Sequence, residues 1–106
     1  MIKHVDFIAV LKYKTTEEGG RKTPAFTRIR PAIKFPFSEY LTSGEQIFIN
    51  KDIVHPGETV EAEIKILAVD VFQNCLEEGM NFSFQEGSRI TGTGRITKIL
   101  NEKLKR

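Results

Sequence analysis

The sequence predicts an all-β protein, a small antiparallel β-barrel of about six strands built from one domain, residues 1–106. Apolar residues recur with a period of two in several segments, which is the pattern of half-buried strands. Turns rich in Gly and Pro separate these segments, and no helical pattern precedes the short basic tail at 101–106. A closed barrel is favoured because it leaves no exposed strand edge.

The first predicted strand has the clearest alternation. Its odd positions are apolar and should face the core: Val5, Phe7, Ala9, Leu11 and Tyr13. A turn-rich break follows at 15–23, and Pro24 bars a central strand at that point. The chain should therefore leave the sheet in a loop before it returns.

Two weaker strands are predicted next. The first has apolar residues on one parity: Ile29, Ile33, Phe35 and Phe37. Pro31 and Pro36 confine this strand to an edge or a bulged position, because proline has no amide hydrogen to donate. A second, short strand is predicted at 46–50.

The second half of the chain contains three more strands. Pro56 and Gly57 form a turn before a strand at 60–68, which has one apolar and one mostly acidic face. A short strand at 81–85 and a long one at 89–100 follow. In the long strand Ile90, Ile96 and Leu100 share a parity with Gly92 and Gly94. The two glycines suit a bend or a close backbone approach, and the tail is expected to fray or to form a helical turn.

Composition indicates a soluble globular protein. The chain is 40% hydrophobic and 28% charged, and no window approaches the roughly 18 apolar residues of a membrane span. No secretion signal is predicted, because Asp6 interrupts the first apolar stretch and no cleavage site follows it. The single Cys75 suits a reducing compartment. We therefore expect a cytoplasmic protein with no membrane partner.

The charges are unevenly distributed along the chain. Residues 12–34 carry seven bases and two acids, and residues 88–106 carry six bases and one acid, so each segment has a net charge of +5. Residues 35–87 carry ten acids and two bases, a net charge of −8. If the two basic segments lie side by side, they form a face that attracts polyanions. The alternative is that these charges only keep the surface solvated.

The run at 20–23 is similar to the end of a phosphate-binding loop, but that motif needs Gly, Lys and Ser/Thr in succession and a further upstream Gly. Arg21 interrupts the succession, Thr15 occupies the place of the upstream Gly, and Pro24 forbids the helix that should follow. We expect no bound nucleotide.

No other catalytic or metal-binding motif is predicted. His4 and His55 are far apart and lack the spacing of metal ligands, and Cys75 has no local activating signature. No pair of carboxylates stands out for acid–base chemistry. We therefore expect no catalytic residue, no metal site and no cofactor, and we predict that the protein is not an enzyme.

Binding is better supported than catalysis. Arg21 and Lys22 at the tip of a Gly-rich loop can make charge-assisted hydrogen bonds to phosphate, and the turn at 87–89 can do the same. In isolation such loops are more often solvated turns.

Four motifs occur in the order and spacing of the third, C-terminal domain of bacterial elongation factor Tu, which the chain resembles over about residues 5–100. They are 18–24 (EGGRKTP), 30–31 (RP), 56–57 (PG) and 86–95 (EGSRITGTGR). The resemblance implies a β-barrel that binds the T-stem side of aminoacyl-tRNA. The GTPase domain and the second barrel of that family have no counterpart here, so we expect a stand-alone module.

The resemblance also implies an RNA-binding set. The positions that match family motifs are Arg21, Lys22, Arg30, Gln85, Glu86, Gly87 and Arg89. Lys22 stands where the family places a T-stem phosphate contact, and Gln85, Glu86 and Gly87 where it approaches the T-stem backbone. The three arginines are expected either to brace the loops or to touch RNA. A carboxylate such as Glu86 can accept a 2′-hydroxyl proton, which distinguishes RNA from DNA.

Departures from the family pattern leave the function open. Ala32 replaces a polar residue at an interdomain position, Ser88 replaces a second Gly, and 36–38 replaces a Thr-rich stretch. The leading prediction is a non-catalytic, translation-linked module that binds tRNA or another structured RNA. The alternative is a protein-interaction module that uses the former interdomain surface to bind a translation-related protein or a second copy, without RNA.

Overall fold

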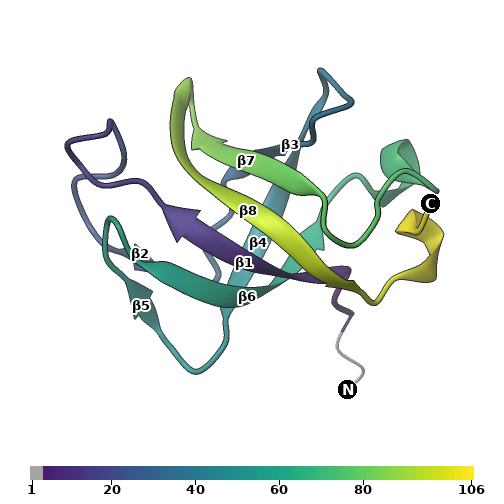
Figure 1. Cartoon of the computed structure of the whole chain (residues 1–106), viewed down its shortest axis with the longest axis horizontal. Helices are drawn as coiled ribbons and strands as arrows, with labels where there is room; N and C mark the ends of the chain where they lie inside the picture. Colours follow the sequence, from purple (N-terminus) through teal and green to yellow (C-terminus); the bar gives the residue numbers. More distant parts are fainter. Residues whose placement is uncertain (1–3) are drawn as a thin grey trace.

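The computed structural model describes residues 4–106 and shows a closed six-stranded antiparallel barrel (Figure 1). Around the barrel the strands follow the order β1-β6-β4-β3-β7-β8, and β8 closes on β1. Their bounds are β1 Phe7–Tyr13, β3 Ala32–Lys34, β4 Leu41–Phe48, β6 Thr59–Ile66, β7 Asn81–Glu86 and β8 Arg89–Ile99. A small ribbon pairs β2 (Ala25–Phe26) with β5 (Ile53–Val54). The predicted all-β barrel is confirmed.

The core lies inside the barrel and follows the predicted alternation in β1 and β6. The odd residues of β1 are buried, as are the residues of β6 from Val60 to Ile66 at alternate positions. The two strands pair with Phe7 opposite Ile64 and Leu11 opposite Val60. Aromatic rings fill the centre, where Phe7 packs edge-on against both Phe35 and Phe82.

Two glycines of β8, Gly92 and Gly94, allow a close approach to the strand, one of the two roles that the sequence suggested. The space that a Cβ would need at Gly94 is filled by the ring of Phe82, and at Gly92 by the ring of Phe84. The β7 rings thus lie directly on the β8 backbone. Only glycine allows this close approach without displacing an aromatic ring.

The region from residue 25 to residue 48 differs from the prediction. The strand expected from Ile29 to Phe37 is shortened to β3, and β3 is an interior strand because it pairs with both β4 and β7. The β2–β5 ribbon was not predicted. Pro31 and Pro36 lie just outside the three residues of β3, so neither interrupts the hydrogen-bonding ladder. Phe37 is largely exposed.

Strand β4 begins at Leu41, five positions before the expected start at residue 46. Its core-facing side carries Thr42, Gly44 and Gln46, all buried. Because none of these core-facing residues is apolar and large, apolar alternation did not predict the first part of the strand.

The residues of one parity in β8 do not all share one face. Ile90 and Leu100 are exposed, whereas Thr91 and Ile99 are buried. The register shifts between Phe84 and Gln85 on one side of β8, and between Ile8 and Ala9 on the other. Each bulge adds one residue to β8. Beyond the bulge, the positions that would have faced the core therefore face solvent, and the reverse.

One end of the barrel is closed by two short 3-10 turns, η1 (Val69–Phe72) and η2 (Glu102–Leu104). Phe72 and Leu104 are buried there. The tail does form a helical turn, and the amide of Arg106 donates to the carbonyl of Leu76 at 2.8 Å. Within residues 4–106 no helix has the length and apolarity that a membrane crossing requires.

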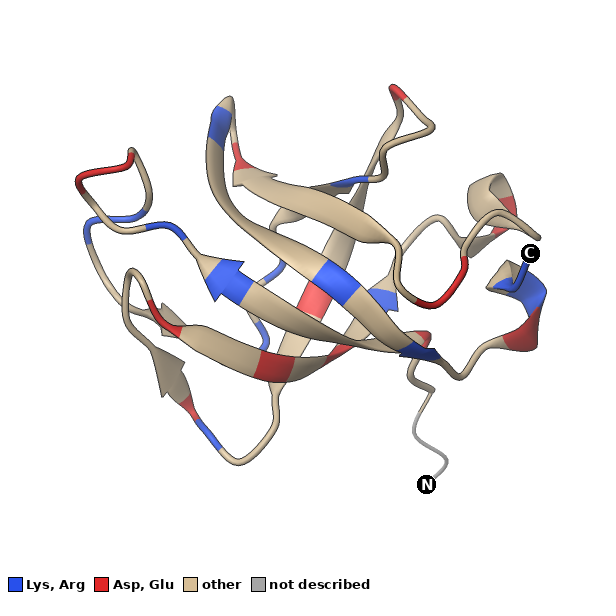
Figure 2. Ribbon diagram, in the orientation of Figure 1, with Lys and Arg blue, Asp and Glu red and all other residues tan. Residues whose placement is uncertain are grey.

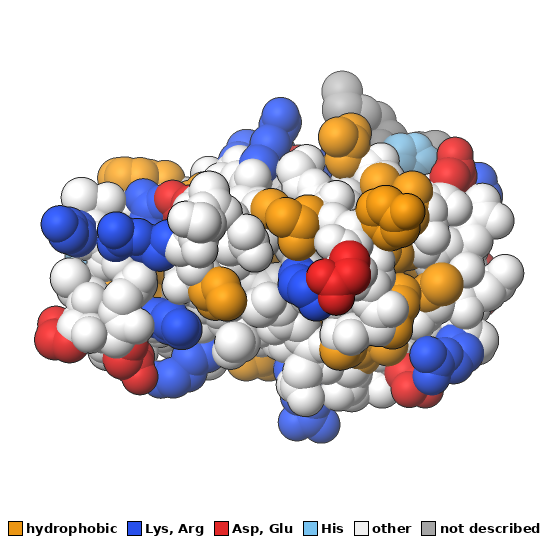
Figure 3. All heavy atoms as spheres, turned by 90° about the horizontal axis from the view of Figure 1, so that it is seen from above, with side chains coloured by type: hydrophobic (Ala, Val, Ile, Leu, Met, Phe, Trp, Pro, Cys, Tyr) orange, Lys and Arg blue, Asp and Glu red, His pale blue; other side chains and the backbone are white. Residues whose placement is uncertain are grey.

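The pairing of β1 with β8 brings the two basic segments of the sequence together. Figure 2 shows Lys and Arg on β1 and β8, and acidic residues on β6 and β4. Seen from above, Lys and Arg side chains gather at the left end of the molecule, where Figure 1 places the loop between β1 and β2 (Figure 3). Hydrophobic side chains are concentrated towards the other half of this face.

Candidate nucleic-acid interface

The loop between β1 and β2, residues 14–24, packs against the β7–β8 hairpin. The amide of Lys14 donates to the carbonyl of Thr91 at 2.9 Å, and Arg89 Nη1 donates to the carbonyl of Gly20 at 3.2 Å. A hollow of about 330 Å³ lies between them. Its lining residues are Arg21, Lys22, Thr23, Glu86, Arg89 and Thr91. Four of the seven residues selected from the sequence therefore line one hollow.

Local sequence fixes the first turn of the loop. The amide of Thr15 donates to Glu18 Oε1 at 2.9 Å, and the amide of Glu18 donates to Thr15 Oγ1 at 3.1 Å. This reciprocal pairing resembles a helix capping box. The amide and hydroxyl of Thr15 hold the pKa of Glu18 below its usual range. Gly20 is buried so close to the carbonyl of Lys14 that a side chain would not fit.

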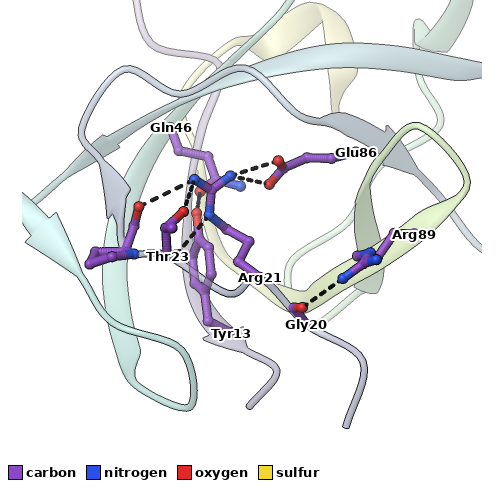
Figure 4. Close-up of polar contacts among 8 residues, drawn as sticks. Tyr13, Gly20, Arg21, Thr23, Gln46, Glu86 and Arg89 are labelled. Atoms are coloured by element: carbon purple, nitrogen blue, oxygen red, sulfur yellow. Dashed lines mark hydrogen bonds and ion pairs between the residues drawn. The ribbon is translucent and has the colours of Figure 1, made fainter. Parts of the chain in front are cut away.

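Arg21 joins the loop to the hairpin. Its Nη1 lies 2.6 Å from both carboxylate oxygens of Glu86. Its remaining nitrogens donate to Thr23 and to the carbonyl of Pro24. Figure 4 shows the guanidinium held between Glu86 on one side and Thr23 on the other. Since the Arg21 side chain is only 19% exposed, this residue braces the loop and offers little surface to a ligand.

Beneath this ion pair lies the buried phenol of Tyr13, which donates to Gln46 Oε1 (Figure 4). Burial raises the pKa of Tyr13 far above its usual range; the nearby Arg21 opposes this shift and Glu86 adds to it. The phenol is therefore neutral at neutral pH.

Lys22 has the opposite surroundings to Arg21. It is exposed and forms no hydrogen bond or ion pair with any residue that the structure describes. Arg89 is intermediate, because it is exposed and its single bond to Gly20 leaves other N–H groups available. The cations that face solvent at the hollow are thus Lys22 and Arg89.

The sequence argument missed Thr91. Its hydroxyl is buried at the hollow and has no hydrogen-bond partner within residues 4–106. Unpaired buried hydroxyls are unfavourable, so this position costs the folded state some stability. The bulge opposite Gln85 turns Thr91 inward, and no sequence signal marked it.

The remaining selected residues lie elsewhere. Gln85 Nε2 donates to the carbonyl of Gly87 at 2.7 Å, so both shape the hairpin turn beside the hollow. Arg30 does not join the cluster: its Nη2 lies 3.8 Å from Glu45 Oε2, and it lines a separate hollow with Lys65.

Nothing in residues 4–106 forms a group of three or more His, Cys, Asp or Glu side chains that could hold a metal ion. His4 and His55 are exposed, and Cys75 is half-buried. No protein-family model matches the chain.

Proposed function

We propose that this protein is a non-catalytic β-barrel module of the elongation factor Tu domain III type that binds tRNA or another structured RNA. Its contact region is the hollow between the 14–24 loop and the β7–β8 hairpin. The observation that supports the proposal most directly is the exposed, unpaired Lys22 on a loop held rigidly by Arg21. A preordered cation loses little conformational entropy when it binds phosphate.

Each part of this region has a role in the proposal. Lys22 and Arg89, which line the hollow and face solvent, neutralise phosphates. Glu86 is paired with Arg21, which suits a bracing role better than direct recognition of a 2′-hydroxyl. Gln85 and Gly87 give the hairpin the shape that approaches the RNA backbone.

Fluorescence titration with tRNA at two salt concentrations tests the proposal. Affinity should fall with salt, with a slope of about −0.9 for each phosphate neutralised on a duplex. Lys22→Glu should weaken binding about tenfold and reduce the slope by about one. Lys103→Glu, an equal charge change in the exposed tail, is the control and should have little effect. Absence of tRNA binding at low salt would refute the proposal.

A second candidate function is protein interaction, and an exposed apolar patch favours it. Leu67 is 82% exposed and Tyr40 74%. The amide of Leu67 donates to the carbonyl of Ser43, two residues from the exposed Leu41 on the same side of β4. A partner recovered from extract after nuclease treatment, and lost with Leu67→Glu, would support this candidate over RNA binding.

A further inference from the structure

The outer surfaces of β3, β4 and β6 carry an exposed apolar strip. Ala32 is opposite Ser43 in the β3–β4 ladder, and the amide of Leu67 donates to the carbonyl of Ser43 at 3.0 Å. Leu41 lies two positions before Ser43, on the same outward side of β4. Leu41 and Leu67 are both exposed, and so is Tyr40, which directly precedes β4. Large apolar side chains gathered on one exposed surface are typical of an interaction site.

Two arginines lie at one end of this strip. Arg28 Nη1 lies 3.4 Å and Arg30 Nη2 3.8 Å from Glu45 Oε2, and both guanidinium groups remain largely exposed above this buried carboxylate. A hollow of about 220 Å³, lined in part by Arg30, Glu45 and Leu67, connects the arginines to the strip. Within residues 4–106 the two guanidinium groups form one hydrogen bond, from Arg28 to Glu45. Most of their N–H groups are therefore available to a carboxylate of another chain.

The other end of the strip carries a carboxylate beside an aromatic ring. Glu39 and Tyr40 are exposed in the turn that joins β3 to β4, directly before Leu41. In Figure 2 this turn projects beyond the strands and is acidic at its tip. A guanidinium can bind such a carboxylate through two parallel hydrogen bonds or stack on the neighbouring ring. Arginine and tyrosine are also enriched among the residues that contribute most to protein interfaces.

Other charges border the strip on both sides. Lys34 is opposite Leu41 and lines the depression towards β7 with Asn81. On β6, Lys65 is opposite Glu45, and Glu63 follows one row further from the strip. Lys65 and Glu63 sum to zero, whereas the two arginines and Glu45 sum to +1. The arginine end is therefore cationic, and it lies across the apolar strip from the carboxylate of the turn.

We propose that this face binds a second copy of the chain in a two-fold symmetric dimer. A two-fold axis through the centre of the strip brings Glu39 of each copy to Arg30 of the other. The same axis brings Leu41 of each copy to Leu67 of the other, so the exposed leucines are buried together. A surface with opposite charges at its two ends and apolar residues between them is complementary to itself. The occupant that fits it is therefore the same surface of another copy.

This inference rests on the second candidate function, protein interaction through the apolar patch, and names the partner. It does not depend on RNA binding. The hollow near Lys22 lies between the 14–24 loop and the β7–β8 hairpin, whereas the dimer face lies on β3, β4 and β6. The two surfaces can therefore be tested with separate variants.

Sedimentation velocity of the full chain, after nuclease treatment and over a wide range of protein concentration, tests the inference. The unmodified protein should shift from monomer to dimer as its concentration rises. Leu67→Glu should weaken dimerisation at least about tenfold, because it buries a carboxylate against apolar side chains in each copy. Thermal melts check that this variant and those below fold.

An exchange of charges tests the contact between Arg30 and Glu39. Arg30→Glu and Glu39→Arg should each weaken dimerisation about tenfold, because each brings like charges together at two symmetric contacts. The double variant R30E/E39R restores opposite charges and should return to within about threefold of the unmodified protein. Arg95→Glu is the charge-matched control, exposed on β8 across the barrel from β4, and should change dimerisation less than about twofold.

The outcomes separate this inference from both candidate functions. A protein that stays monomeric at its highest concentration overturns the inference, and so does a folded R30E/E39R variant that dimerises no better than the single variants. If the protein is monomeric and a partner from extract is lost with Leu67→Glu, the second candidate function stands without the dimer. Because dimerisation is measured without RNA, a failure to bind tRNA would refute only the proposed RNA binding.

Discussion

Arg21 and Lys22 are adjacent in the chain and have opposite surroundings. Arg21 donates the hydrogen bonds that join the 14–24 loop to the carboxylate of Glu86. Lys22 forms no hydrogen bond within residues 4–106. Composition alone treats the two as equivalent bases. The structure separates a residue that stabilises the loop from one that is available to a ligand.

We predict that Arg21→Ala lowers the free energy of unfolding by about 2 kcal/mol, because it removes a two-oxygen contact with Glu86 and leaves that carboxylate partly buried. Lys22→Ala should change it by less than about 0.5 kcal/mol. Urea denaturation measures both. A double-mutant cycle with Glu86→Ala should give a coupling energy of about 1 kcal/mol; additive effects would contradict the brace.

Ionisation of Tyr13 should make the free energy of unfolding depend on pH in the alkaline range. The phenol has a raised pKa in the folded protein, whereas in the unfolded chain it ionises near pH 10. Its contribution is therefore complete below about pH 10 and is lost as the pH rises above that value. The slope of stability against pH should reach about −1.4 kcal/mol per pH unit from this group alone.

Tyr13→Phe should reduce that slope, and Tyr40→Phe should not. Tyr40 is the control because its ring is 74% exposed. Urea denaturation at a series of alkaline pH values gives the slope for each variant. Identical slopes for the two variants would show that Tyr13 does not cause the pH dependence.

At the scale of single strands, the sequence predicted β1, β6 and β7 well because one face of each is uniformly apolar. It failed where the core-facing residues are polar or where the ladder is irregular. Gln46 is fully buried in β4, where its amide oxygen accepts from Tyr13. In β8 the bulges exchange the faces, so Ile90 is exposed and Thr91 is buried. A period of two carries no information about where such a shift occurs.

The contact between β7 and β8 depends on glycine. We predict that Gly94→Ala destabilises the barrel by about 1–3 kcal/mol, because its Cβ would overlap the ring of Phe82. Adding Phe82→Leu should make the double variant more stable than the sum of the two single changes predicts. Thermal denaturation gives the four stabilities. Strict additivity would mean that the strand accommodates the methyl group by another route.

For the whole molecule, the paired basic loops could be predicted from the sequence, but the arrangement of the charges on the barrel could not. Arg21 and Arg89 were selected by motif, yet their bonds to Glu86 and Gly20 depend on contacts far along the chain. The register that places Lys12 opposite Thr93, and Ser83 opposite both Thr93 and Lys34, was not predicted. Register is set by bulges and tertiary packing, which leave little trace in local patterns.

Barrel closure also determines how the protein should fold. Within residues 4–106, strand β1 pairs with β6 and β8, so its strand pairings are all distant in sequence. The β7–β8 hairpin is local, with Glu86 opposite Arg89. Because closing long loops is entropically unfavourable, we expect folding on the millisecond-to-second scale, with the hairpin formed before β1 docks.

Two buried residues test this order. Leu11→Ala in β1 should mainly accelerate unfolding, with a φ-value of about 0–0.3, and Phe84→Leu in β7 should slow folding, with a φ-value of about 0.5–0.8. Stopped-flow measurements of folding and unfolding against urea concentration give both values. If Leu11→Ala raised the activation free energy of folding by the full amount of its lost stability, its φ-value would be about 1. β1 would then already be paired in the transition state, and closure of the barrel by β1 would be an early step.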